Sequence, residues 1–229
     1  MSENYLVIPD LQIPFEAKNA LSFATSVKKH YGIKDEHCLC AGDELDQYYG
    51  SAFAKNPDAR HSAVSELEES LDRLKQWYAA FPKMKVAVSN HGLRYWKRAS
   101  DAGIPSRVLR TYKETLEAPK DWYWQDSWII QASRRPFMMV HGMEYGGQTP
   151  YRMAPLIEGM SVVHGHLHSS AGIAYIRTKN QNLWGFNVGS LIDPDAYAFQ
   201  YSKYSRFKAN LGIGVIANGG TTPLWIPYE

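Results

Sequence analysis

The sequence predicts an α/β fold, and three features of the chain lead to that prediction. Five short apolar runs each end in a polar cluster, as buried parallel strands do when a ligand site lies beyond their carboxyl ends. Helical periodicity separates the earlier runs, whereas strand-like pieces dominate after residue 145. At 229 residues the chain is long enough for one well-filled core, so we expect a single layered domain over 1–229.

The first half of the chain alternates strands with helices. Strands are expected at about 4–9, 38–41 and 84–88, and helices at 17–30 and 62–80. The first helix ends in a basic turn before Gly32, which is a stop signal. The second helix has an apolar stripe at helical spacing, and Ser62 is its expected N-cap.

The second half is predicted to be richer in strands. Apolar runs at 137–142 and 161–168 surround a short candidate helix at 149–158. Further strand-like pieces follow at 171–177, 182–188, 211–217 and 222–226. The Gly and Asn residues between them fit turns and hairpins, so a β-rich half follows the α/β half in the same domain.

The composition is that of an ordinary globular protein, with 45% apolar and 21% charged residues. No apolar stretch approaches the ~18 residues of a membrane span, and the N-terminus has no basic region followed by an apolar one. We therefore expect a cytoplasmic protein without a membrane partner. The net charge of +2 is too small to imply a polyanionic partner by itself. Cys38 and Cys40 are expected to be buried and reduced, because their spacing suits neither a disulfide nor a zinc site.

The polar residues at the ends of the apolar runs are hard oxygen donors and imidazoles, which suit a pair of divalent metal ions. The candidate ligands are Asp10, Gln12, Asp43, Asn90, His141, His166 and His168. Asp10 and Gln12 project to the same side of an extended segment, and the two oxygens of Asp43 can bridge two ions. Two ions and two aspartates leave a charge of about +2, which suits binding of a phosphate ester and stabilisation of its transition state. A water bridging the ions would have a lowered pKa and would serve as the nucleophile.

In their order along the chain, the polar clusters resemble the motifs of the calcineurin-like metallophosphoesterases, in a small bacterial or viral form. The family pattern runs Asp-x-His, Gly-Asp-x-x-Asp, Gly-Asn-His-Asp/Glu, a lone His and Gly-His-x-His. The matching blocks are Asp10-Leu11-Gln12, Gly42-Asp43-Glu44-Leu45-Asp46, Ser89-Asn90-His91-Gly92, His141-Gly142 and Gly165-His166-Leu167-His168. They span residues 10–168, about two-thirds of the chain.

The resemblance implies a four-layer α/β/β/α sandwich and a role for each matched residue. One ion would be held by Asp10, Gln12, Asp43 and His168, and the other by Asp43, Asn90, His141 and His166. His91 would donate a proton to the leaving oxygen or hold the phosphoryl group, and Asp46 would orient His91. His164, just before the last motif, is expected to lie at a strand end behind the ligands.

Three residues depart from the family pattern. Gln12 replaces a histidine, so we expect a looser first site that binds manganese or magnesium in preference to zinc, with iron as a further candidate. Alternatively, Gln12 binds the ion only through water. Ser89 replaces a glycine and is expected to alter only the turn. Gly92 replaces an acidic residue, whose role must be absent or supplied elsewhere.

The segment 94–124 follows His91 directly and is both basic and aromatic. It suggests an insert that tracks a nucleic-acid backbone and stacks bases, with Arg94 as the expected phosphate contact. The alternative, which we favour, is a solvated helix packed on the core through Leu109, Tyr112 and Leu116, with aromatic residues closing the domain edge. A second basic and aromatic patch lies at 201–208.

Taken together, these features predict a two-metal hydrolase of phosphate esters, with manganese the first choice of metal. A phosphodiesterase or nuclease acting on DNA or RNA is the favoured reaction class. A small-molecule phosphomonoesterase is the first alternative, and a non-catalytic binding scaffold of the same fold is the second. The scaffold is less favoured because His91 and six of the seven ligand positions keep the family residue.

Overall fold

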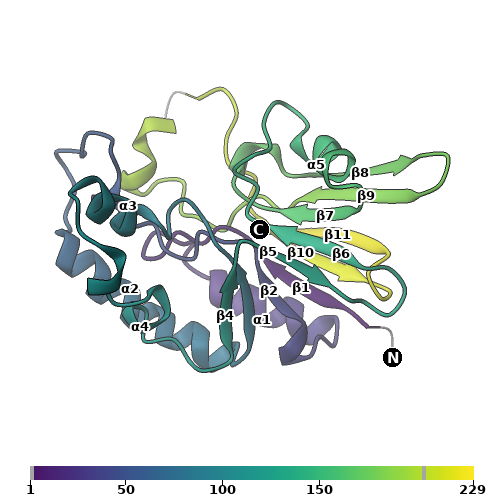
Figure 1. The fold of residues 1–229 in the computed structure, drawn as a ribbon, viewed down its shortest axis with the longest axis horizontal. Coiled ribbons are helices and arrows are strands. Elements are labelled where there is room, and N and C mark those ends of the chain that lie inside the picture. Colours follow the sequence, from purple (N-terminus) through teal and green to yellow (C-terminus); the bar gives the residue numbers. More distant parts are fainter. Residues whose placement is uncertain (1–2, 203–204) are drawn as a thin grey trace.

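The computed structural model describes residues 3–202 and 205–229, and it contains two β-sheets stacked between helices (Figure 1). The strands are β1 (Tyr5–Ile8), β2 (Cys38–Cys40), β3 (Met84–Ala87), β4 (Trp122–Gln125), β5 (Ser127–Ile130), β6 (Phe137–Val140), β7 (Ser161–His164), β8 (Gly172–Arg177), β9 (Asn182–Asn187), β10 (Gly212–Ala217) and β11 (Thr222–Pro227). The six-stranded sheet has the order β11-β10-β1-β2-β3-β4, and the five-stranded sheet has the order β5-β6-β7-β9-β8.

Helices cover the outer face of each sheet. The α-helices are α1 (Ala20–His30), α2 (Ala63–Ala80), α3 (Arg94–Asp101), α4 (Tyr112–Thr115) and α5 (Pro150–Glu158). The 3₁₀ helices are η1 (Asp35–His37), η2 (Tyr48–Gly50), η3 (Ser106–Val108), η4 (His168–Ser170) and η5 (Tyr197–Ser202). Helices α1 and α2 pack on the six-stranded sheet, while α5 packs on the five-stranded sheet against β7, β8 and β9. No helix of the described residues is both long enough and apolar enough to cross a bilayer.

Side chains along each strand point alternately to the two faces of the sheet, and this alternation produces the layers. In β1, Leu6 and Ile8 face the apolar cluster under α1 and α2, whereas Tyr5 and Val7 face the cluster between the sheets. That inner cluster also contains Phe186 of β9, so the two sheets share one apolar interior. The result is the four-layer α/β/β/α arrangement that the sequence predicts.

Strand direction brings polar ends together. Strands β1, β2, β3 and β4 are parallel to one another, and so are β6, β7 and β9. The chain leaves neighbouring parallel strands at the same edge of a sheet, so residues that follow β1, β2 and β3 gather there. Those that follow β6 and β7 gather at one edge of the other sheet.

Several local predictions are confirmed. The Ser62 side chain accepts a hydrogen bond from the backbone N–H of Ser65, which makes it the N-cap of α2. Cys38 and Cys40 are free and buried. The 94–124 segment is not the single helix of the alternative interpretation, because it consists of α3, η3 and α4 followed by β4.

Candidate metal centre

All seven predicted ligands follow strands whose ends meet between the two sheets. Asp10 and Gln12 follow β1, Asp43 follows β2 and Asn90 follows β3 on the six-stranded side. His141 follows β6, and His166 and His168 follow β7 on the five-stranded side. The structure therefore brings together residues that lie up to 158 positions apart in the sequence.

One group of candidate ligands consists of Asp43, His141 and His166, whose ligand atoms lie within 4.8 Å of one another. The Nε2 atom of His141 is 3.4 Å from Asp43 Oδ2 and donates to Asn90 Oδ1 at 2.9 Å. Its Nδ1 atom donates to the backbone carbonyl of Ala41 at 2.9 Å. The imidazole of His141 is therefore held at both of its nitrogens, and Asn90 completes this group.

A second group consists of Asp10, Asp43 and His168, again with ligand atoms within 4.8 Å. The Nε2 atom of His168 is 3.0 Å from Asp10 Oδ2. The side-chain amide nitrogen of Gln12 lies 3.3 Å from Asp43 Oδ2 and 3.4 Å from His168 Nε2. Asp43 belongs to both groups, so the arrangement offers two ion positions that share one carboxylate.

Two buried oxygens show that this donor set suits a cation. Asp10 Oδ1 and Gln12 Oε1 are buried and accept no hydrogen bond. A buried oxygen without a partner is costly, and a divalent ion would provide the missing interaction. The amide of Gln12 would have to rotate to present its oxygen, because its nitrogen now faces the other donors.

The charges of the site are strongly linked. Burial opposes ionisation of Asp43, yet His141 and His91 hold the pKa of its carboxyl well below the usual value. Burial would lower the pKa of His141, but the carboxylates of Asp43 and Asp10 raise it to about 10. In contrast, burial and the neighbouring His141 lower the pKa of His166. The carboxylate of Asp43 and the protonated His141 therefore form an ion pair. A metal ion bound at this position would displace the proton of His141.

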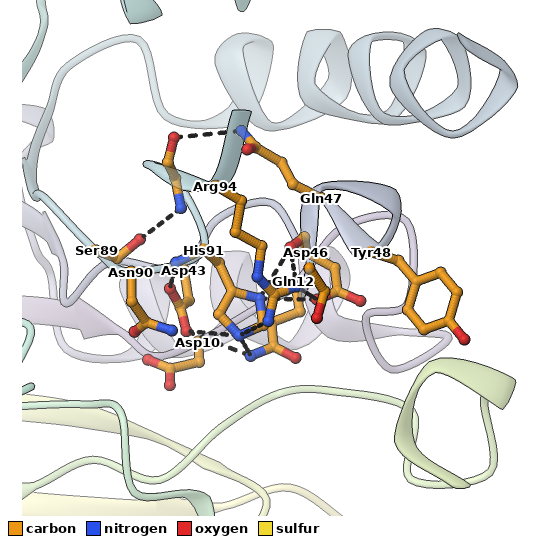
Figure 2. A network of polar contacts seen from close by, with 12 residues as sticks. Asp10, Gln12, Asp43, Asp46, Gln47, Tyr48, Ser89, Asn90, His91 and Arg94 are labelled. Atoms are coloured by element: carbon orange, nitrogen blue, oxygen red, sulfur yellow. Dashed lines mark hydrogen bonds and ion pairs between the residues drawn. The ribbon is translucent and has the colours of Figure 1, made fainter. Parts of the chain in front are cut away.

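His91 sits between Asp46 and Arg94 (Figure 2). Its Nδ1 atom lies 2.7 Å from Asp46 Oδ1, and Arg94 Nη1 donates to the same oxygen at 2.9 Å. Arg94 Nη2 lies 2.8 Å from His91 Nε2. An arginine only donates, so in this arrangement the Nε2 atom accepts and the ring proton is on Nδ1, facing Asp46. The predicted carboxylate–imidazole pair is present, and the arginine completes a chain of three groups.

The backbone of the site is unusual in a way that the motifs do not reveal. Gln12, Asp43 and His166 have φ values of 50°, 47° and 70°, in the left-handed region that side chains disfavour. Such conformations cost about 1–3 kcal/mol each and persist where the surrounding structure imposes them. Here they turn three candidate ligands toward a common centre.

Two motif glycines are required by close packing. A Cβ at Gly165 would collide with Asp10 Oδ1, and one at Gly42 would lie 2.7 Å from His141 Nδ1. Neither position can carry a side chain while Asp10 and His141 stay in place. The glycines in these two motifs thus have a steric explanation in this chain.

The departures at positions 89 and 92 are linked to each other. The Ser89 hydroxyl accepts from the Gly92 N–H at 3.2 Å and also helps to lower the pKa of Asp43. The expectation that Ser89 alters only the turn is therefore too narrow. A Cβ at Gly92 would lie 3.1 Å from the hydroxyl of Tyr112. Tyr112 occupies the space that a larger residue at position 92 would need.

His164 belongs to neither group of ligands found among the described residues. Its ring packs against Tyr145, its Nδ1 atom contacts the carbonyl of Gly165, and burial lowers its pKa to about 4. This position behind the ligands is the one expected from the sequence.

Much of the segment 94–124 packs on the protein, whereas the ring of Tyr123 stays half exposed. Trp122 is buried and donates to the carbonyl of Phe81 at 2.8 Å, and Trp124 donates to Glu44 at 2.9 Å. Arg98 donates to the carbonyl of Ser51 at 2.7 Å, and Leu116 and Tyr112 pack against the core as the alternative interpretation expects. In the second basic patch, residues 203 and 204 lie outside the described residues.

No protein-family model and no curated protein matches the sequence. Solved structures match the fold at low sequence identity. Vacuolar protein sorting 29 from Cryptosporidium parvum has a TM-score of 0.51 and 12% identity, covering 98% of this chain and 89% of that one. A hypothetical protein from Pyrococcus horikoshii has a TM-score of 0.51 and 11% identity, covering 99% and 88%.

A phosphoesterase from E. coli, Yfce, matches with a TM-score of 0.47 and 14% identity, covering 97% of this chain and 99% of that one. At such identities the matches bear on the fold alone. Together with the two stacked sheets and their outer helices, they establish the four-layer α/β/β/α sandwich fold.

Proposed function

We propose that the protein is a metal-dependent phosphodiesterase that uses two divalent ions, with manganese preferred over magnesium, iron or zinc. The observation that carries this proposal is the position of Asp43, which belongs to both groups of candidate ligands. A shared carboxylate between two groups of oxygen and imidazole donors is suited to a binuclear centre. His91, Asp46 and Arg94 lie directly beside it.

The proposed ligands divide as the geometry groups them. One ion would be held by Asp10, Gln12, Asp43 and His168, and the other by Asp43, Asn90, His141 and His166. Bound ions would supply positive charge to a phosphoryl group and lower the pKa of a water molecule that attacks it.

The chain's own groups would bind the phosphoryl group and move a proton. Arg94 is the candidate for holding a phosphoryl oxygen, because its guanidinium already reaches the Nε2 atom of His91. Burial disfavours the charged form of His91, but Asp43 and Asp46 raise its pKa and so favour an imidazolium that donates a proton to the leaving oxygen. Asp46 would keep the ring oriented. The contact between Arg94 and His91 must open before Nε2 can carry that proton.

Two features favour a small phosphodiester, one over a phosphomonoester and the other over the diester linkages of a nucleic acid. Apart from Arg94 beside His91, no lysine or arginine of the described residues lies at the pocket beside the candidate ligands, which suits the single charge of a diester better than a dianion. Trp122 and Trp124, two of the aromatic residues expected to stack on bases, are packed into the fold. We therefore place small phosphodiesters ahead of DNA and RNA as substrates.

Two other functions would use the same fold, and the experiment described below distinguishes them from a phosphodiesterase. A small-molecule phosphomonoesterase would use the same side chains. A non-catalytic scaffold is also compatible with the fold, because one structural neighbour is named for vacuolar protein sorting and not for an enzyme. The intact chain of Asp46, His91 and Arg94 supports an enzyme over that scaffold.

The experiment compares manganese-dependent hydrolysis of bis(p-nitrophenyl) phosphate with that of p-nitrophenyl phosphate. Asp43→Ala is the blank, and Asp72→Ala on the exposed face of α2 is the matched control. We expect the diester to be preferred by the wild type and by the control, with no turnover by the blank. Preference for the monoester would indicate a phosphatase. No hydrolysis of either ester by the metal-loaded protein would support the scaffold.

A further inference from the structure

A pocket of about 300 Å³ opens beside the candidate metal centre, and the two ends of its lining differ in character. One end is formed by site residues, including Asp43, His91 and His168. The other end carries no charged side chain among the described residues. Its principal members are Leu167, Ser169, Ile192, Phe199, Ser205 and Phe207. Whatever is attached to a phosphoryl group at the first end would extend toward this neutral wall.

The floor of the neutral wall is fixed by the core. Ile192 and Phe199 are almost completely buried, in a small apolar cluster with Phe15 and Tyr48. The Phe15 ring lies 6.2 Å from Phe199 and 6.4 Å from Tyr48, in edge-to-face contacts. Figure 2 shows the Tyr48 ring pointing away from the candidate ligands, and it lies 5.3 Å from the ring of Tyr197 in η5. The wall is therefore preformed and anchored to the loops that carry Gln12 and Asp43.

Phe207 forms the rim of the same pocket and is 69% exposed. Covering a large apolar side chain that faces water with a ligand lowers the free energy of the complex. No aromatic contact of Phe207 occurs among the described residues, so its ring face is open to a ligand. The Ser169 and Ser205 side chains add hydroxyl groups near the ring without adding charge.

The size and neutrality of this wall select among possible substituents. The pocket is at the small end of the range for organic ligands, about 300–1,000 Å³, so it suits one ring system better than an extended strand. Among the described residues that line this wall, no cation would meet a second phosphate. A planar ring would gain both apolar contact and stacking, since a base on an aromatic side chain is a favourable pair.

We propose that the substrate is a phosphate ester that carries one neutral planar ring, of nucleobase size, and that Phe207 determines this specificity by stacking on the ring. The proposal rests on the proposed function for the position of the phosphoryl group. The recognition surface itself is formed by protein side chains, so ring binding is measurable without metal and without turnover.

The first experiment measures binding to the metal-free protein by isothermal titration calorimetry in EDTA. The probes are adenosine 5′-monophosphate and ribose 5-phosphate, which share the sugar and phosphate and differ in the ring. We expect the nucleotide to bind at least about tenfold more tightly, as stacking of one base implies. Equal affinities, or no detectable binding of either probe, would overturn the proposal.

Variants then test whether Phe207 is responsible. Phe207→Ala should bring the two dissociation constants together, and Phe207→Tyr should keep them apart because it retains the ring. Tyr175→Ala on β8 is the matched control, because Tyr175 is equally exposed at 66% and does not line the pocket. A preference that survives Phe207→Ala, or that is lost in Tyr175→Ala, would contradict the assignment.

Hydrolysis separates this inference from the proposed function. The p-nitrophenyl ester of thymidine 5′-monophosphate and ethyl p-nitrophenyl phosphate have the same leaving group and differ in the remaining substituent. We expect kcat/KM with manganese to favour the thymidine ester by about tenfold or more. Equal rates would overturn the ring specificity while the phosphodiesterase stands. Ring binding without hydrolysis of either ester would instead reject the phosphodiesterase.

Discussion

The two groups of candidate ligands that share Asp43 differ in how firmly the protein holds them. On one side, His141 is fully buried, and its Nδ1 atom donates to the carbonyl of Ala41. On the other side, His168 is 17% exposed and lines the open pocket. Among the described residues, no comparable backbone partner is found for the Nδ1 atom of His168. A histidine ligand whose second nitrogen is held by a carbonyl is fixed in tautomer and orientation.

The same asymmetry appears in the neutral ligands. Asn90 already points its oxygen at His141, whereas Gln12 presents its nitrogen to the other ligands and leaves its oxygen unpaired. The side with His141 is thus organised before metal binds, and the side with Gln12 must rearrange. We expect the first manganese ion to occupy the His141 side and the second to bind more weakly on the Gln12 side.

Removing the shared residue should have the largest effect, because it affects both sides at once. Asp43→Ala is expected to abolish hydrolysis and to remove the pairing partner of the buried, positively charged His141. Circular dichroism with chemical denaturation checks that the variant folds, and Asp43→Asn offers a less disruptive second variant. Full turnover by a folded Asp43→Asn protein would mean that the two groups do not act as one centre.

His91 lies beside both groups and belongs to neither, so its loss should separate chemistry from metal binding. His91→Ala is expected to keep both ions and to lose about 10²–10⁴-fold in kcat, the contribution of general-acid catalysis. Metal content and steady-state kinetics are measured on the same sample. A smaller loss should follow Asp46→Asn, because that residue orients the ring without meeting substrate. A His91→Ala enzyme with wild-type kcat would remove His91 from the reaction.

The ion pair between Asp43 and His141 predicts how the stability of the metal-free protein responds to pH. The pKa of His141 is about 10 in the folded protein and ordinarily near 6.5, so its stabilising contribution is complete below pH 6.5 and is lost as pH rises toward 10. Melting temperatures in EDTA at pH 6.5 and pH 9 should therefore fall more in the wild type than in His141→Gln. Equal falls in the two proteins would show that the pair does not form.

Gln12→His tests the group of ligands that contains Gln12 and His168, and this substitution should have the smallest effect. An imidazole binds manganese more tightly than an amide oxygen, so the affinity of the weaker ion should rise, by less than about tenfold or about 1.4 kcal/mol. The affinity of the stronger ion should stay the same. Calorimetric manganese titrations resolve the two events. No change in either affinity would indicate that residue 12 does not bind the ion directly.

The sequence was sufficient to predict which candidate ligands come together, because each one follows an apolar run. Period and composition identify β1, β2, β3, β6 and β7, and parallel strands then bring their ends together. The left-handed backbone at Gln12, Asp43 and His166 could not be predicted in this way. This backbone conformation depends on packing between loops that are remote in sequence. Only glycine residues indicate a left-handed conformation reliably in a sequence.

In the segment 94–124 the sequence left two interpretations open, and the structure bears out the packed one. Trp122 and Trp124 suggested stacking on bases, yet they belong to β4, whose inward and outward alternation places Trp122 in the core. Aromatic residues favour strands as well as ligand sites, and only the pairing of β4 with β3 in the fold decides between the two. The neutral wall formed by Ile192, Phe199 and Phe207 could not be predicted as a unit, because only the fold brings these residues together, although Phe207 lies in the 201–208 patch.

The most direct test of the account is the number of manganese ions bound per chain, measured by equilibrium dialysis with metal analysis. The wild type should bind two ions of unequal affinity, and folded Asp43→Asn should lose the weaker ion completely and bind the other far less tightly. One ion per chain in the wild type, or two ions in the variant, would contradict a centre in which Asp43 is shared.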